Sequence, residues 1–180
     1  DVLEQFEYDP VGNVLKSIDG ELGETAYTYD ANDSLVSVTD PLGHQTNFEY
    51  SRNVLRTKIT DPLFHETNFA YDLDRRLTSI TDPIGNVRQN FYDENDNLTR
   101  SIDGRSFEKH YEYDVLDRLT RFTDESGFSE NYQYDPVSNL IEKQNRRGFE
   151  THYEYSPVDR LTRMTDAKGN FDTYSYDPDG

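Results

Sequence analysis

The chain has 180 residues, of which 36 are acidic and 18 basic, and its formal net charge of −18 argues against nucleic acid and anionic membrane surfaces as partners. It contains no cysteine, which excludes a disulfide framework, a thiolate nucleophile and a zinc site built on cysteine. No apolar run approaches the ~20 residues of a membrane-spanning helix and no signal segment opens the chain, so we expect no membrane insertion.

One tyrosine recurs every 21 residues along the whole chain. A second aromatic ring lies two positions before it, except in the fifth copy, where Asn90 takes that place and Phe91 has moved by one. Such a fixed period indicates a repeat architecture, in which each unit buries its apolar side against its neighbours. The sequence therefore predicts one array over residues 1–180, about 8.5 units, with no separate domain. The signature positions are Tyr8, Tyr29, Tyr50, Tyr71, Tyr92, Tyr113, Tyr134, Tyr155 and Tyr176.

Two short strands are expected in each unit, because Tyr, Phe, Thr, Val and Ile are plentiful while Ala is scarce. In the strand that leads into the tyrosine, aromatic and polar residues alternate, so that Phe48 and Tyr50 share one face. We expect these rings to form the core. In the following strand, Leu77 and Ile80 have a spacing that alternation cannot place on one face, which predicts a β-bulge.

Two turns connect the strands, and all seven prolines fall at these turns. The first reads Tyr-Asp-x-x-Gly and the second Asp-Pro-x-Gly, with Gly or Asp at a position that favours left-handed backbone. Val54 and Arg75 do not fit the first pattern. In the third unit, Leu55 and Ile59 lie one residue further apart than their counterparts, which predicts a shorter turn there.

Two architectures accommodate this unit. A parallel β-helix would stack equivalent residues ~4.8 Å apart and bring the aspartates of successive turns into unfavourable contact. Antiparallel hairpins place two strands between equivalents, which separates them by ~10 Å. We therefore favour an all-β fold of tandem 21-residue β-hairpin repeats in an antiparallel sheet, with no helix longer than one turn.

The copies at residues 127–140 and 148–161 resemble the RHS/YD-repeat family, whose consensus is a glycine followed by aromatic-x-Tyr-Asp-x-x-Gly-Arg/Asn-Leu. The resemblance implies a curved spiral sheet that winds, in long members, into a hollow shell. Such shells enclose a toxic C-terminal domain in bacterial polymorphic and insecticidal toxins, and form an adhesion scaffold in teneurins.

For this chain, the resemblance implies a non-enzymatic structural segment of such a shell, secreted or at the cell surface, that encloses or displays a toxin or another domain. The chain is too short to close a shell. We therefore expect its end strands to pair with neighbouring repeats or, end to end, with copies of itself.

The carboxylates and histidines are the candidates for catalytic and metal-binding residues. The segments 40–43 and 82–85 superficially match the aspartyl self-cleavage element of the family, but they lie in phase with ordinary turns. His44 and His65 share a phase without a regular third ligand, and His110 and His152 are two units apart. The acidic turns supply too few oxygens per unit for the six to eight that Ca²⁺ requires. The sequence predicts no catalytic residue, cofactor or metal ligand.

The alternative function is an adhesion or carbohydrate-binding module. Exposed aromatic rings beside carboxylates can hold sugars, and an outward ring such as Phe91 is the candidate for glycan contact.

Overall fold

The computed structural model describes residues 4–177, which form β-strands and turns and no helix. They divide into two compact units, residues 1–89 and residues 90–180. No described segment offers a helix long and apolar enough to cross a membrane. The strands are β1 (Gln5–Tyr8), β2 (Val14–Ile18), β3 (Glu24–Tyr29), β4 (Leu35–Thr39), β5 (Gln45–Tyr50), β6 (Arg56–Thr60), β7 (Glu66–Tyr71), β8 (Leu77–Thr81), β9 (Val87–Tyr92), β10 (Leu98–Ile102), β11 (Glu108–Tyr113), β12 (Leu119–Thr123), β13 (Ser129–Tyr134), β14 (Leu140–Gln144), β15 (Glu150–Tyr155), β16 (Leu161–Thr165) and β17 (Phe171–Thr173).

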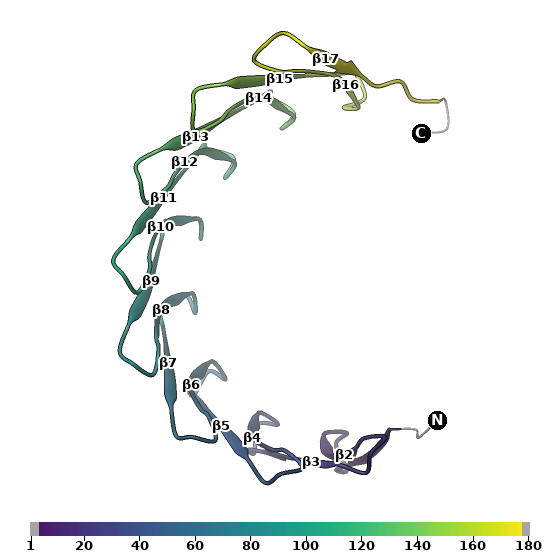
Figure 1. The fold of residues 1–180 in the computed structure, drawn as a ribbon, viewed down its shortest axis with the longest axis vertical. Coiled ribbons are helices and arrows are strands. Elements are labelled where there is room, and N and C mark those ends of the chain that lie inside the picture. Colours follow the sequence, from purple (N-terminus) through teal and green to yellow (C-terminus); the bar gives the residue numbers. More distant parts are fainter. Residues whose placement is uncertain (1–3, 178–180) are drawn as a thin grey trace. The chain divides into compact units, whose positions relative to one another are not determined.

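Within each unit, every strand pairs antiparallel with the next strand in the sequence. The hairpin prediction is therefore confirmed, and the parallel β-helix is excluded. Successive hairpins turn relative to one another, so each unit taken by itself is a bent sheet (Figure 1).

The predicted bulge is present in seven of the hairpins that contain a signature tyrosine. In the pair β7–β8, Phe69 lies opposite Ile80 and Tyr71 opposite Leu77, and the register shift leaves Thr78 as the extra residue. The Thr78 hydroxyl donates to the Ala70 carbonyl oxygen at 3.2 Å, which stabilises the bulge. The bulge places both aliphatic side chains on the face that carries the rings, as the sequence required.

The two turns of the repeat have the same geometry. In the turn 40–44, the Asp40 amide donates to the His44 carbonyl at 3.0 Å, and the Gly43 amide donates to the Asp40 carbonyl at 2.9 Å. Sixteen turns of the described residues share this pattern, and the fourth residue of each has a positive φ.

The prediction of a shorter turn in the third unit is wrong. Val54 and Arg75 adopt φ values of 62° and 69° although neither is a residue that favours them. Arg56 lies opposite Tyr50, where leucine stands in most other copies, and Leu55 is the last residue of a turn of normal length. The hydrogen bonds of the turn therefore impose the left-handed backbone at Val54, against a cost of roughly 1–2 kcal/mol.

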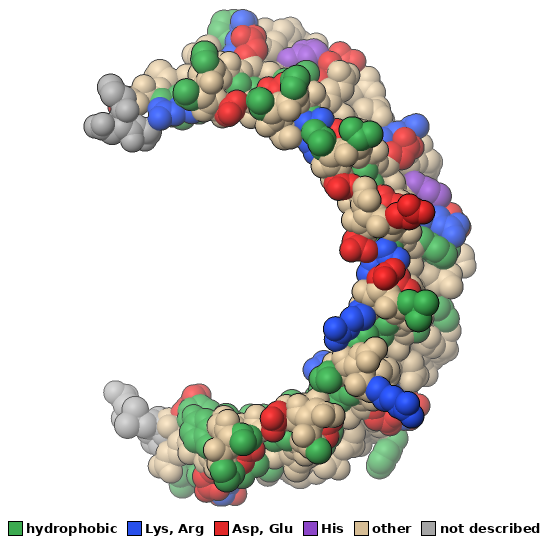
Figure 2. Space-filling view, turned by 180° about the vertical axis from the view of Figure 1, so that it is seen from behind, with side chains coloured by type: hydrophobic (Ala, Val, Ile, Leu, Met, Phe, Trp, Pro, Cys, Tyr) green, Lys and Arg blue, Asp and Glu red, His purple; other side chains and the backbone are tan. Residues whose placement is uncertain are grey.

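The expectation that the aromatic rings form a buried core is also wrong. Among the described residues, no hydrophobic side chain is buried, and the only buried side chains are those of Ser34, Ser37 and Asp124. Each unit is a single sheet layer, in which the rings are half-covered by neighbours on the same face. On the surface in view, hydrophobic and charged side chains are interspersed (Figure 2). The rings are therefore partly buried by contact with neighbours on the same face, and not by enclosure between two layers.

Candidate functional site

The signature tyrosines connect neighbouring repeats through their hydroxyl groups. Tyr29 donates to the Val14 carbonyl oxygen at 3.0 Å, although the register of β2 and β3 ends at the pair Lys16 and Ala26. The phenol therefore reaches a carbonyl beyond the strand pairing. At least seven signature tyrosines donate in this way to the carbonyl 15 residues earlier, at 2.9–3.1 Å: Tyr29, Tyr50, Tyr71, Tyr113, Tyr134, Tyr155 and Tyr176. We call this contact the tyrosine clamp.

Partial burial favours the neutral phenol that the clamp requires. It raises the pKa of Tyr29, Tyr113, Tyr134 and Tyr155 above the ordinary value. A phenylalanine would preserve the ring contacts but not this bond. The clamp thus explains why the repeat carries tyrosine, which the ring spacing alone did not reveal.

The aspartate that opens most of the turns is held by backbone amides. Oδ1 of Asp40 accepts from the Leu42 and His44 amides at 2.9 and 2.8 Å. Such bonds favour the carboxylate, and the one from the fifth turn residue lowers the pKa of Asp40 and of Asp103. Asn145 takes this place in one turn and accepts the same two bonds through Oδ1 at 2.9 and 3.1 Å, and Ser51 and Ser156 accept them through Oγ in two others. The turn therefore requires an acceptor oxygen rather than a charge.

A second contact joins the first turns of successive repeats. Nδ2 of Asn13 donates to Oδ2 of Asp9 in its own turn at 2.9 Å and to Oδ1 of Asp33 in the next repeat at 3.0 Å. Asn139 bridges Asp135 and Asp159 in the same manner, at 3.0 and 2.9 Å. The aspartate at the left-handed position therefore serves as the acceptor for the preceding repeat.

Among the catalytic and metal-binding candidates, the aspartates and the pair His44 and His65 lie in these turns, whereas His110 lies in β11 and His152 in β15. Asp40 and Asp82 open ordinary turns and accept amide bonds, as the sequence predicted. His44 and His65 each direct Nδ1 toward the aspartate of its own turn, at 2.9 Å from Oδ2 of Asp40 and of Asp61 respectively. Each histidine thus contacts its own turn.

Phe91, the outward ring considered for sugar contact, is covered by another side chain. The Arg100 guanidinium carbon lies 3.9 Å from its centroid, and the ring is half-buried. This cation–π contact occupies the face that a sugar would need.

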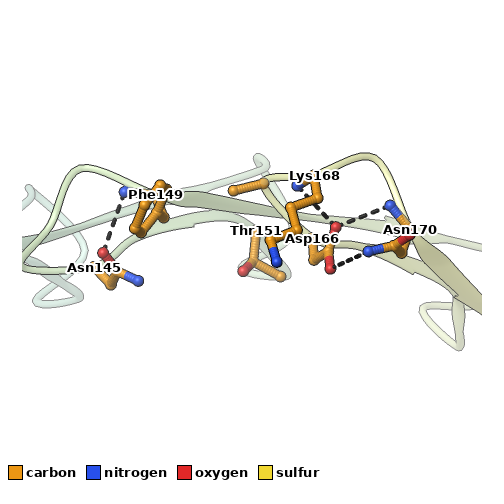
Figure 3. Close-up of a pocket in the computed structure, with 7 residues that line it drawn as sticks. Asn145, Phe149, Thr151, Asp166, Lys168 and Asn170 are labelled. Atoms are coloured by element: carbon orange, nitrogen blue, oxygen red, sulfur yellow. Dashed lines mark hydrogen bonds between the residues drawn. The ribbon is translucent and has the colours of Figure 1, made fainter.

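A shallow pocket of about 280 Å³ lies between the turns 145–149 and 166–170 of unit 2 (Figure 3). Oδ1 of Asp166 accepts from the Lys168 and Asn170 amides, so this oxygen is engaged in its own turn. Phe149, 55% exposed, and the side chains of Thr151 and Lys168 are the groups that a ligand would meet.

The clamp, the bulge and the two turns together define the repeat. The sequence that forms these repeats matches the models of two known families. A model of the RHS Repeat matches residues 8–45 and 29–63, and a model of the Teneurin YD-shell matches residues 94–180. The chain belongs to the RHS/YD-repeat family. No curated protein matches it by sequence.

Solved structures share the fold of this chain. A structure of TcdB2-TccC3-Cdc42 matches with a TM-score of 0.56 and 14% identity, over 91% of this chain and 11% of that chain. A structure of TcdB2-TccC3 without its hypervariable C-terminal region matches with a TM-score of 0.55, also at 14% identity and over 91% and 11% of the two chains. At this identity the likeness concerns the fold alone, and the chain spans about a tenth of the length of those chains.

Proposed function

We propose that this chain is a non-enzymatic wall segment of an RHS/YD-type shell that encloses or displays a toxin or another domain. The tyrosine clamp is the observation that carries the proposal, because it joins each repeat to the one before it and so suits a continuous wall. Membership of a family of shell repeats supports the same role. In this role residues 1–180 act as one array, secreted or at the cell surface.

The strand edges indicate how such a wall continues. Among the described residues of its own unit, β1 pairs with β2 alone and β17 with β16 alone. We propose that the free edges take further repeats or another copy of the chain. Because the net charge of −18 opposes self-association, sedimentation should show more association as salt screens that charge. A strictly monomeric chain at every salt concentration would contradict the pairing between copies.

Photo-cross-linking in the full-length parent protein tests enclosure. Phe69 and Asn68 lie next to each other in β7 and point to opposite faces, so a photoreactive residue at either position samples one face of the wall. We expect cross-links to an enclosed domain from one of the two positions only. If neither position gives cross-links, the wall does not enclose a domain, and display of a domain remains as its role. A catalytic activity that a single substitution abolishes would contradict the non-enzymatic role.

The pocket of unit 2 favours one alternative, a carbohydrate-binding or adhesion module. Phe149 presents an exposed ring beside Thr151 and Lys168, which together offer stacking and hydrogen bonding to a sugar. Glycan-array binding that is lost on Phe149→Ala and kept on Phe128→Ala, at the same place one repeat earlier, would favour this function.

A further inference from the structure

Three potential metal ligands lie together on the face of the β14–β15 hairpin that does not carry the rings. One oxygen each of Glu142 and Glu150 and one ring nitrogen of His152 all lie within 4.8 Å of one another. Nδ1 of His152 is 3.5 Å from Oε2 of Glu142, and its Nε2 is 3.7 Å from Oε2 of Glu150. Glu142 is directly opposite His152 in the register, so the hairpin itself holds the group together.

Position 142 carries a negative charge, unlike the equivalent position in the other complete copies. The equivalent residue in every other complete copy is a lysine, an arginine or a serine: Lys16, Ser37, Lys58, Ser79, Arg100, Arg121 and Arg163. The cations there pair with glutamates on neighbouring strands, as Lys58 does with Glu49 and Glu66 at 2.6 and 3.1 Å. In the β14–β15 hairpin, a carboxylate replaces the cation beside Glu150, which leaves two like charges next to each other.

Amide side chains hold both carboxylates in place. Nε2 of Gln133 donates to Oε1 of Glu142 at 2.6 Å, and Nε2 of Gln144 donates to Oε1 of Glu150 at 3.1 Å. Each bond uses one carboxylate oxygen and leaves Oε2, the atom nearer to His152, for another partner. Hydrogen bonds of this kind orient metal-ligating carboxylates.

We propose that Glu142, Glu150 and His152 bind a divalent transition-metal ion, with Zn²⁺ as the best fit. One imidazole and two carboxylates are accepted Zn²⁺ ligands, and water would complete a tetrahedral set. The imidazole distinguishes the site from one for Ca²⁺ or Mg²⁺, which take oxygen ligands. Tetrahedral ligands of Zn²⁺ are about 3.3 Å apart, so the side chains would move closer together around the ion, with one ring nitrogen of His152 as ligand. The ion would also neutralise the two facing carboxylates and bridge neighbouring strands.

The same hairpin two repeats earlier provides a natural control. Glu108 and His110 occupy the places of Glu150 and His152, but Arg100 stands in the place of Glu142. Nη1 of Arg100 lies 3.6 Å from Oε2 of Glu108 and supplies the positive charge that a metal would bring. The proposal therefore predicts a metal site in the β14–β15 hairpin and none in the β10–β11 hairpin.

Calorimetric titration of the 180-residue chain with Zn²⁺, with Co²⁺ absorption as a spectroscopic check, tests the inference. We expect one site per chain. Replacing a ligand in H152N or E142R should weaken binding by roughly 10–100-fold or more, whereas H110N should leave it unchanged. These substitutions suit the repeat, because Asn131 and Arg121 occupy the corresponding places one unit earlier.

A gain of binding is the stricter test. In the H152N background, R100E should create a site with Glu108 and His110 and restore Zn²⁺ binding. The inference is overturned if the original chain binds no Zn²⁺, if H110N weakens binding as much as H152N, or if E142R has no effect. Circular dichroism of each variant distinguishes loss of the site from loss of the fold.

Discussion

The two faces of the hairpin sheet hold the repeats together in different ways. On the aromatic face, Tyr113 contributes a half-buried ring and a 3.1 Å hydrogen bond to the carbonyl of Leu98, 15 residues earlier. On the polar face, exposed ion pairs such as Lys58 with Glu66 join adjacent strands. The clamp recurs with little variation, whereas the ion pairs differ from repeat to repeat. The aromatic face therefore maintains the architecture, and the polar face is free to acquire local chemistry.

Acid is expected to have the largest effect, because it acts on most of the turns and on the polar face at once while leaving the phenols unchanged. The folded pKa of several turn aspartates, Asp40 and Asp103 among them, is held below the unfolded value of about 3.9 by backbone amides that donate to the carboxylate. Their contribution to stability is therefore complete above that value and is lost as the pH falls through the lowered folded pKa values. Thermal melts followed by far-UV circular dichroism should show Tm falling below about pH 4; a Tm that stays constant to pH 2 would contradict the role of the turns.

Truncating a ring should be the largest single-residue effect. We expect Tyr113→Ala to lower the free energy of unfolding by roughly 2–3 kcal/mol, less than the 3–5 kcal/mol typical of fully buried rings, because the ring is half-buried. The matched control is Glu112→Ala, the next residue along β11 on the polar face, for which about 0.5 kcal/mol or less is expected. Denaturant titrations measure both. Equal losses would remove the distinction between the faces.

Removing only the hydroxyl isolates the clamp. Tyr113→Phe keeps the ring and should lower the free energy of unfolding by about 1 kcal/mol, the usual net contribution of one hydrogen bond. Tyr8, whose ring is 57% exposed, provides the comparison, and Tyr8→Phe should change stability by less than about 0.5 kcal/mol. If the two substitutions have the same effect, the phenol acts only through its ring.

The smallest effect is expected for an ion pair of the polar face. Lys58→Met should cost about 0.5 kcal/mol, although Lys58 contacts both Glu49 and Glu66, because the glutamates are exposed. High salt should abolish the difference between the variant and the original chain, since it screens exposed charges. A loss that persists in high salt would mean that the lysine stem, rather than its charge, stabilises the sheet.

The sequence predicted the repeat, the antiparallel hairpins, the bulge and both turns because each depends on local spacing that recurs in the chain. It did not reveal that Val54 and Arg75 occupy left-handed positions, since hydrogen bonds within the turn override the preference of those side chains. The expected core failed for a different reason. Alternation shows which residues share a face, but not whether a second layer covers it.

The candidate sites were predicted unevenly. The turn role of Asp40 and Asp82 followed from their phase. The clamp was missed because its two partners are 15 residues apart, although the invariance of tyrosine over phenylalanine at this position was a usable signal. The spacing of the histidines does not reveal the group around Glu142. The usable signal was the carboxylate at position 142, on the strand that faces His152, where other copies carry a basic residue or serine.

The tyrosine clamp has a consequence for how the chain is made. Each clamp is donated by the later repeat to a carbonyl that has already left the ribosome, so a repeat is completed only when the next one emerges. At about 5–20 residues per second, 21 residues take roughly 1–4 s, which is long compared with hairpin formation in microseconds. The chain can therefore fold in one direction during synthesis, as each new tyrosine forms its hydrogen bond to the preceding strand.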